Sequence, residues 1–210
     1  MLFARPPAEV VAAADALPGR DTPLQVPEAH HVNGRPITPP WPDGHELLVV
    51  GMGCFWGPER LYWQLDGVWT TFVGYAGGHT PNPTYREVCT GRTGHAEIAV
   101  AVFDPDLVEL DTLLATFWEN HDPTQQMRQG NDVGTQYRSI VLATSPEQSA
   151  AAIASRDRYQ ARLREAGITA PITTTVEPLD QLYWAEAEHQ QYLAKHPGGY
   201  CNHGFCQATY

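Results

Sequence analysis

The feature that most constrains this chain is an abrupt change of pattern within residues 47–62. An apolar run ends at two glycines, and a cysteine, two aromatic residues and the sequence Gly-Pro-Glu follow directly. The apolar run predicts a buried strand. Pro58 suits the first turn of a helix and Glu59 favours the positive end of the helix dipole, so a helix should begin near Gly57. Cys54 is therefore expected just outside the N-terminus of that helix.

The position of Cys54 favours a reactive thiol. A free thiol has a pKa near ~8.5, and a helix N-terminus or a nearby cation lowers that pKa, which makes the sulfur a better nucleophile at neutral pH. Phe55 and Trp56 follow directly. Two adjacent aromatic side chains at such a turn do not readily point into one core, so one or both should wall a cleft. The alternative is a buried cysteine that acts as a small hydrophobic residue.

The rest of the chain alternates between strand and helix patterns. The predicted strands are residues 46–52, 68–75, 95–103, 137–143 and 172–176, and the predicted helices are residues 57–65, 110–120, 146–166 and 182–195. The first six elements follow the order βαββαβ, which is the ferredoxin-like pattern of an antiparallel sheet with helices on one face. The sequence therefore predicts an α+β fold in which a further helix, strand and C-terminal helix follow this core.

Two irregular segments flank the predicted core. Half of the eighteen prolines fall within residues 1–45, so this region cannot form a continuous helix or a central strand and should be an irregular arm. Residues 46–196 should form one catalytic domain, because 210 residues suffice for one well-cored domain with an appendage. Residues 197–210 are rich in glycine and have no helical or strand period, which predicts a mobile tail.

Composition excludes several classes of function. The net charge of −11 opposes non-specific binding to nucleic acid or to anionic lipid, because both depend on clustered positive charge. The N-terminus lacks the apolar region of a signal peptide, and the apolar run at residues 10–14 is too short to span a bilayer, so we expect a cytoplasmic protein. Four cysteines are too few for a disulfide scaffold and in a reducing compartment suggest catalysis or metal binding.

The two cysteines of the tail, Cys201 and Cys206, suit resolving thiols. A mobile thiol can reach a sulfenic acid on Cys54 and condense with it to a disulfide, and a second thiol allows a relay. The alternative is a zinc site built on Cys201, His203 and Cys206, although this spacing lacks the paired form of structural zinc sites and needs a fourth ligand. Cys89 is expected to be inert packing.

Glu97 is the candidate acid. It alternates with Ile98 in the predicted strand, so it shares its face with Ala99 and Ala101 and has no obvious ion-pair partner there. A carboxyl group in a partly apolar cleft has a raised pKa and can act as a general acid near neutral pH. A solvated glutamate on an exposed face of the sheet is the alternative.

Several other polar residues stand where they could face the same cleft. Tyr85 and Tyr137 lie at borders between loops and regular structure, where a phenol can donate a hydrogen bond, although half-buried packing is the alternative for each. Asp132 has the sequence context of a turn. His189 and Tyr192 are three residues apart in a predicted helix and should share a face.

The segment Gly53-Cys54-Phe55-Trp56-Gly57 resembles the signature of the type A peptide methionine sulfoxide reductases, which reverse methionine oxidation. The resemblance extends over most of the chain. Further similar blocks, in order, are residues 15–20, 74–78, 81–85, 93–97, 120–124, 129–132, 134–139 and 189–193. Chance is a poor explanation for so many blocks in the same order.

This resemblance implies a reductase of the S epimer of methionine sulfoxide, free or in proteins, that repairs oxidised proteins. It implies no cofactor, sulfenic acid and disulfide intermediates, thioredoxin as reductant and a monomer. The implied roles are: Cys54 as nucleophile; Glu97 as acid; Tyr85 and Tyr137 as donors to the sulfoxide oxygen; Phe55 and Trp56 as the methyl pocket; Asp132, His189, Tyr192 and Tyr200 as support; and Cys201 as the first resolving cysteine. Cys206 follows after four residues, a shorter tail than three-cysteine members lead us to expect.

Two other classes of function compete with this interpretation. A cysteine hydrolase or acyltransferase would need a histidine base, such as His121 or His189, within hydrogen-bond reach of Cys54. A non-catalytic interaction module stabilised by zinc would need the metal site of the tail.

Overall fold

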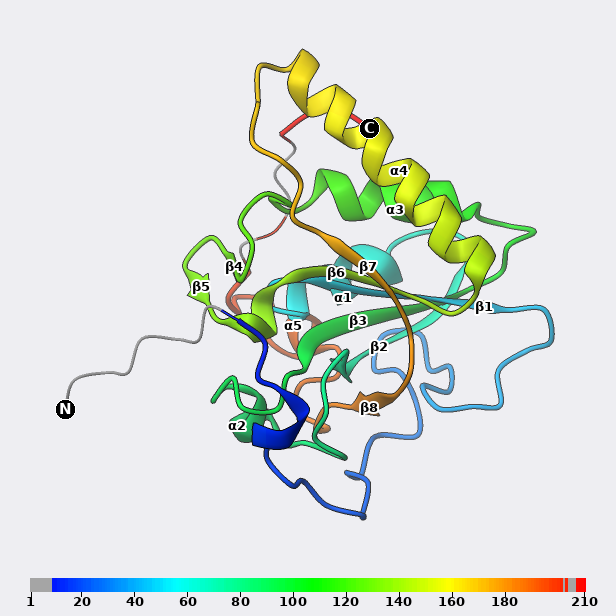
Figure 1. The fold of residues 1–210 in the computed structure, drawn as a ribbon. Helices are drawn as coiled ribbons and strands as arrows, with labels where there is room; N and C mark the ends of the chain where they lie inside the picture. Colours follow the sequence, from blue (N-terminus) through cyan, green and yellow to red (C-terminus); the bar gives the residue numbers. More distant parts are fainter. Residues whose placement is uncertain (1–8, 202, 204–206) are drawn as a thin grey trace.

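The fold is a mixed α+β fold built around one curled sheet (Figure 1). This computed structural model describes residues 9–201, 203 and 207–210. Within these residues six strands form the sheet, in the order β7-β6-β1-β3-β2-β8, and only β6 and β7 pair in parallel. The strands are β1 (Glu46–Met52), β2 (Val68–Ala76), β3 (Ala96–Phe103), β6 (Ser139–Ala143), β7 (Thr175–Pro178) and β8 (Leu182–Trp184). A separate hairpin pairs β4 (Arg128–Gln129) with β5 (Asp132–Val133).

The helices vary widely in length. They are α1 (Trp56–Trp63), α2 (Tyr85–Val88), α3 (Leu110–Glu119), α4 (Pro146–Glu165) and α5 (Tyr192–Lys195), with 3-10 turns at Ala13–Asp15 and Thr135–Tyr137. The longest, α4, begins where the sequence predicts: the Ser145 side chain accepts the backbone N–H of Gln148, and Pro146 occupies the first turn. No helix in the described part of the chain is long and apolar enough to cross a membrane.

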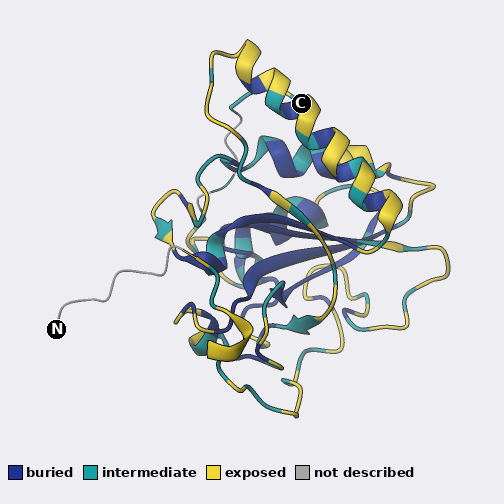
Figure 2. Cartoon of the chain, in the orientation of Figure 1, coloured by how far each residue is buried: buried dark blue, intermediate teal, exposed yellow. Residues whose placement is uncertain are grey.

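One face of the sheet is covered by α1, α3 and α4, and the main core lies between these layers (Figures 1 and 2). Leu48 and Val50 of β1 meet Phe117 and Trp118 of α3 there, and Tyr159 of α4 stacks on Trp118. The outer side of α4 is exposed, as its alternation of polar and apolar residues requires (Figure 2).

The opposite face of the sheet is covered by the arm rather than by helices. Ile37 is fully buried against β2 and β3, and Trp41 stacks on Phe72 with ring centroids 6.1 Å apart. Ile98 and Val100 point to this face, so the neighbouring Glu97 points to the helix-covered side, as the alternation predicts. The described part of the arm therefore covers one face of the sheet, and Glu97 lies on the opposite face.

The prediction of one long helix over residues 182–195 is wrong. Residues 182–184 form the edge strand β8, and only residues 192–195 are helical. The strand forms because β2 offers a free edge, and Gly74 lets the backbone of Tyr183 approach closely. Pairing with a distant strand thus overrides the local helical pattern.

Smaller differences arise from capping and register. Residues 85–88 form a helical turn that the sequence interpretation treated as loop; Thr84 and Glu87 cap each other across it, in the Thr-x-x-Glu pattern of a capping box. The last predicted strand shifts to Thr175–Pro178, where it pairs with β6. The other predicted helices and strands agree with the structure to within one or two residues at most ends.

Candidate active site

Cys54 lies between the end of β1 and the start of α1, as predicted. Helix α1 begins at Trp56 with Phe55 as its N-cap, so Cys54 directly precedes the cap. Gly53 makes the turn with a φ of +94°, a conformation that favours glycine. The Cys54 side chain is only 8% exposed. The strand, the turn and the helix together hold the sulfur in a nearly closed site.

The expectation that this thiol ionises easily is wrong for the structure described. Burial raises the pKa of Cys54 above its ordinary value, and the negative charge of Glu97 raises it further. A hydrogen bond from the backbone N–H of Trp56 lowers the pKa, as a helix N-terminus should, but it is outweighed. Cys54 therefore stays a protonated thiol until its burial is relieved or the neighbouring negative charge is neutralised.

Glu97 is buried directly beside the turn that carries Cys54. The side chain is 1% exposed, and its Oε2 atom accepts the backbone N–H of Phe55 at 3.2 Å. Burial raises the pKa of Glu97 to about 8, with a further contribution from Asp132. Its Oε1 atom has no hydrogen-bond partner among residues 9–201, 203 and 207–210. The exposed-face alternative is thus wrong, and a largely protonated carboxyl group is available at neutral pH.

Five rings, which we call the aromatic cluster, gather beside this turn: Phe55, Trp56, Tyr85, His189 and Tyr192. Trp56 stacks on Tyr192 with centroids 3.9 Å apart, and His189 lies 4.5 Å from Tyr85 and 5.4 Å from Phe55. The indole N–H of Trp56 donates to Nδ1 of His189 at 3.3 Å. The cluster brings α1, α2 and the segment before α5 to one place.

Tyr85 and Tyr137 both lie within electrostatic reach of Glu97. Burial raises the pKa of each phenol, and the Glu97 charge raises it further, so both stay protonated and can donate. Tyr85 also interacts with Cys54. Glu186 supports Tyr85: it accepts the Tyr85 backbone N–H at 2.7 Å.

Asp132 and Tyr200 meet on the other side of the site. Asp132 stands in β5, and the hydroxyl of Tyr200 donates to its Oδ2 atom at 3.2 Å. The charge of Asp132 acts on both Cys54 and Glu97 and raises the pKa of each. Tyr200 is 45% exposed and precedes Cys201, so this contact joins the tail to the site.

The described part of the tail packs against α1. Arg60 donates from Nη2 to the sulfur of Cys201 at 3.2 Å, and His203 donates from Nε2 to the carbonyl of Met52 at 2.6 Å. The ring of His203 fills the space above Gly57, where any Cβ would overlap it. Cys206 lies outside the described residues.

The hydrolase alternative finds little support in these contacts, whereas the zinc alternative includes Cys206, which lies outside the described residues. His121 is fully buried, and its ring nitrogens are engaged by the carbonyl of Phe117 and the hydroxyl of Ser139, so it is no base for Cys54. His189 uses Nδ1 to accept the Trp56 indole N–H. No group of three potential metal ligands is present in the described part of the chain.

Cys89 is not packed in the interior, so the prediction of inert packing is wrong. It is exposed at the end of α2, and its sulfur forms a hydrogen bond with the hydroxyl of Tyr85. Cys89 is the C-cap of α2, the helical turn that the sequence interpretation missed.

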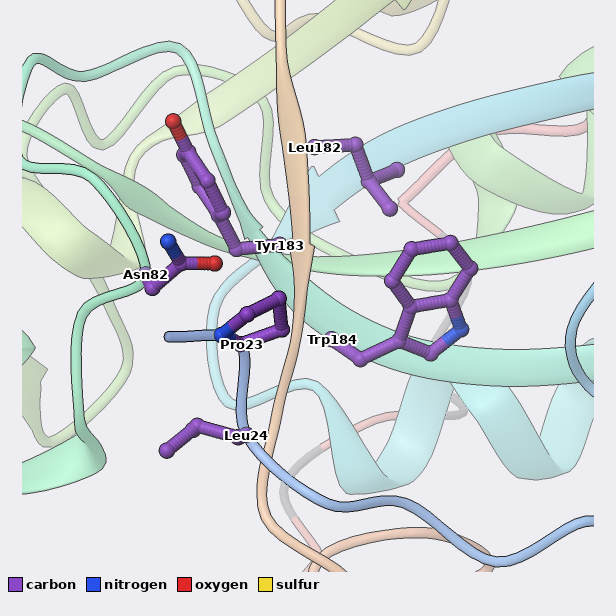
Figure 3. Close-up of a pocket in the computed structure, with 6 residues that line it drawn as sticks. All are labelled: Pro23, Leu24, Asn82, Leu182, Tyr183 and Trp184. Atoms are coloured by element: carbon purple, nitrogen blue, oxygen red, sulfur yellow. The ribbon is translucent and has the colours of Figure 1, made fainter. Parts of the chain in front are cut away.

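A surface pocket lies elsewhere, between the arm and β8 (Figure 3). Pro23 and Leu24 of the arm face Tyr183 and Trp184 across it. None of the predicted site residues lines this pocket.

Four residues around the site were not identified from the sequence: Glu59, Arg60, Glu186 and Gln191. Glu59 was interpreted only as a helix-dipole residue, yet it is fully buried and accepts two hydrogen bonds from Gln191. Its place one helical turn after Trp56 was an available signal. Gln191 and Glu186 were missed because residues 182–195 were wrongly predicted to form one helix.

Comparison with known proteins agrees with this geometry. The model of the family described as peptide methionine sulfoxide reductase matches residues 46–209. The peptide methionine sulfoxide reductase MsrA of Methylococcus capsulatus is 62% identical over 187 residues, covering 89% of this chain and 84% of that protein.

Two solved structures are similar to this chain. Methionine sulfoxide reductase A of Corynebacterium diphtheriae has a TM-score of 0.85 and 47% identity, and the match covers 92% of this chain and 94% of that one. Mxr1 from Saccharomyces cerevisiae in complex with Trx2 shares the fold, with a TM-score of 0.55 and 22% identity over 81% of this chain and 96% of that one. Both the family match and the identity to MsrA extend over most of the sequence. The chain therefore belongs to the peptide methionine sulfoxide reductase family.

Proposed function

We propose that this methionine sulfoxide reductase uses Cys54 as its nucleophile and Glu97 as its acid, acting on the S epimer of methionine sulfoxide. The observation that carries the proposal is the hydrogen bond from the Phe55 backbone to the buried Glu97 carboxyl group, one residue from the sulfur. A protonated acid and a thiol next to each other suit the reduction of a sulfoxide without a cofactor.

The first step transfers the oxygen atom. Glu97 gives its proton to the S=O oxygen, while the hydroxyls of Tyr85 and Tyr137 donate hydrogen bonds to the same atom. The substrate sulfur becomes electrophilic and Cys54 attacks it, its thiol proton passing to Glu97. This attack forms a transient S–S bond. The protonated oxygen then moves to the Cys54 sulfur: the substrate S–O bond and the S–S bond break, a new S–O bond forms on Cys54, and methionine leaves with Cys54 as a sulfenic acid. Methionine sulfoxide is reduced and Cys54 is oxidised by the same two electrons.

The aromatic cluster provides the binding surface for the substrate. Phe55 and Trp56 hold the methyl group, because their apolar rings lie next to the nucleophile. Tyr192 stacks on Trp56, and His189 accepts the indole N–H of Trp56, so these two residues hold Trp56 in position. Asp132 and Tyr200 hold the tail beside the site.

The second step regenerates the thiol. Cys201 attacks the sulfenic acid, which gives a Cys54–Cys201 disulfide and releases water. Cys206 then exchanges into this disulfide, pairs with Cys201 and frees Cys54. We assign thioredoxin as the final reductant, for which the solved complex of yeast Mxr1 with Trx2 is a precedent in a protein of the same fold.

The finer organisation of the chain also remains a proposal. We assign a ferredoxin-like core, supported by the strand order β6-β1-β3-β2, within a catalytic domain of residues 46–196. We assign the described residues 9–45 to the arm and residues 197–201, 203 and 207–210 to a separate C-terminal tail. We further propose a monomer that repairs oxidised proteins in the cytoplasm, where thiols such as Cys54, Cys89 and Cys201 stay reduced.

A chiral assay tests the function directly. The reduced protein is mixed with the separate S and R diastereomers of free and peptide-bound methionine sulfoxide, with and without thioredoxin. We expect consumption of the S epimer alone, about one equivalent or a few without reductant, and continuous turnover with thioredoxin. Consumption of the R epimer, or thioester hydrolysis without sulfoxide reduction, would contradict the proposal.

A further inference from the structure

The reaction above leaves the buried carboxyl group of Glu59 without a role. Glu59 lies in α1, one turn after Trp56, and is 0% exposed. Its carboxylate accepts two hydrogen bonds from a single residue: the backbone N–H of Gln191 reaches Oε2 at 2.8 Å, and the side-chain N–H of Gln191 reaches Oε1 at 2.7 Å. A buried carboxyl group is costly unless it is hydrogen-bonded, so these contacts tie Glu59 to Gln191.

Gln191 stands at a strained point of the backbone next to the aromatic cluster. It is the N-cap of α5 and has a φ of +48°, a left-handed conformation that costs a residue other than glycine about 1 kcal/mol or more. Tyr192 follows it and stacks on Trp56 at 3.9 Å. Trp56 and Glu59, one turn apart on α1, therefore engage Tyr192 and Gln191, which are adjacent in the chain.

A second anchor holds the same segment to the sheet independently of Glu59. The side chain of Gln190 accepts the backbone N–H of Val73 at 3.0 Å and donates to the carbonyls of Val73 and Ala185, each at 2.9 Å. This anchor sets the distance of the segment from β2. The contact between Glu59 and Gln191 then sets the rotation of the segment that places Tyr192 against Trp56.

The arm reaches Glu59 by two routes. The backbone N–H of His31 donates to Oε1 of Gln191 at 3.0 Å. Nδ1 of the buried His30 accepts the backbone N–H of Val32, so its proton lies on Nε2, which donates to the hydroxyl of Thr71 at 3.0 Å. The Thr71 hydroxyl is in turn hydrogen-bonded to Glu59. Glu59 is thus where α1, the arm and the segment before α5 meet.

We propose that Glu59 is a positioning residue of the sulfoxide reduction: through Gln191 it holds Tyr192 and His189 against Trp56, and so shapes the surface that binds the methyl group of the substrate. This inference rests on the proposed function of the site. Glu59 touches neither Cys54 nor Glu97 in any described contact, so its loss should weaken substrate binding and leave the chemical step unchanged.

The central test is a swap of the two side chains. In Glu59→Gln, the new amide offers one acceptor where Gln191 presents two donors, so one buried N–H loses its partner. Adding Gln191→Glu restores the pattern: the amide oxygen at position 59 accepts the backbone N–H, and its NH2 group donates to the new carboxylate. Single-turnover rates of the reduced protein are measured over a range of S-sulfoxide concentrations, without reductant.

We expect Glu59→Gln to raise the half-saturating concentration about tenfold, the cost of leaving one buried N–H without its partner, with a maximal rate within about twofold of the unsubstituted protein. The double substitution should return that concentration to within about threefold. Leu163→Ala, a cavity substitution in α4 far from the cluster, controls for lost stability: it should lower the melting temperature and leave both constants unchanged.

Other outcomes would overturn the proposal. These are an unchanged half-saturating concentration in Glu59→Gln, an equal loss in the maximal rate, or no rescue by the swap. If Glu59→Gln does not fold, Gln191→Ala replaces it: that variant keeps the backbone N–H donor to Glu59, removes the side-chain N–H donor and the acceptor for His31, and should raise the half-saturating concentration severalfold. No reduction by the unsubstituted protein would instead contradict the proposed function itself.

Discussion

Glu97 in β3 accepts the backbone N–H of Phe55 at 3.2 Å, which joins the acid to the residue that follows the nucleophile. The contact follows from the sheet: β1 and β3 are adjacent antiparallel strands, and Val50 pairs with Ala99. Carrying this register on by two residues brings Glu97 level with the end of β1, where Cys54 begins the turn into α1. The distance between acid and sulfur is therefore set by strand pairing rather than by a flexible loop.

Replacing Cys54 and Cys201, one at a time, should separate the two steps. Cys54→Ser should abolish sulfoxide reduction, because a hydroxyl is a far weaker nucleophile at neutral pH. Cys201→Ser should still release about one methionine per protein in a single turnover and then stop. Released methionine is measured by amino-acid analysis. Continuous turnover of Cys201→Ser with thioredoxin alone would rule out the resolving role.

Glu97→Gln should slow the sulfoxide step roughly 10²- to 10⁴-fold, the usual contribution of a general acid. An amide retains the size and the acceptor for Phe55 but has no proton to give. Single-turnover methionine release measures the rate, and the melting temperature shows that the fold is retained. Glu46→Gln, at an exposed position on the neighbouring strand, is the matched control and should have no effect. Equal rates in both variants would remove Glu97 as the acid.

The free energy of unfolding should fall as pH rises from about 7 to about 8. Burial raises the pKa of both Glu59 and Glu97 from 4.5 to about 8, so in this range the folded protein keeps protons that the unfolded chain has lost. Each group contributes a slope of up to about 1.4 kcal/mol per pH unit. Buried histidines such as His121, whose pKa is lowered to about 3, act in the opposite direction, mainly below about pH 7.

Urea unfolding of the reduced protein at several pH values checks this slope. Replacement of either carboxyl group by an amide should reduce the slope, since the amide does not titrate. A stability that rises with pH between about 7 and about 8 in the unsubstituted protein would contradict the raised pKa values.

Arg60→Met should slow formation of the Cys54–Cys201 disulfide and leave the first methionine release unchanged. The guanidinium group holds the Cys201 sulfur beside α1 at 3.2 Å, and an apolar side chain of similar length lacks this donor. Rapid quenching followed by thiol counting measures the disulfide step. Arg164→Met, an exposed substitution near the end of α4, serves as the control and should not change either step.

Gly57→Ala should expel the ring of His203 from its place against α1. A Cβ at this position would overlap the imidazole ring, whereas a Cβ at Gly198 meets nothing within 4 Å, so Gly198→Ala is the matched control. Burial lowers the pKa of His203 to about 4, and release into water should return that pKa to about 6.5. Titration of the His203 ring signals by NMR distinguishes the outcomes, and an unchanged low pKa in Gly57→Ala would contradict the packing.

The local sequence pattern was sufficient to predict the backbone that positions the central residues of the site. The strand, the glycine turn and the helix start around Cys54 depend on neighbouring residues, and the alternation of β3 assigns Glu97 to the helix-covered face. The family resemblance indicated which other residues should lie near Cys54 and Glu97. In the structure Tyr85, Tyr137 and His189 lie close to these two residues.

The sequence alone determined most of the strands and helices up to the end of α4, and where the thiol lies among them, because these properties depend on contacts within a few residues. Only the tertiary structure decided the burial that raises the pKa of Cys54, the conversion of residues 182–184 into an edge strand, and the pairing of Glu59 with Gln191. Each of these depends on segments far apart in the chain, whose contacts determine desolvation and hydrogen bonding, and no local pattern records them.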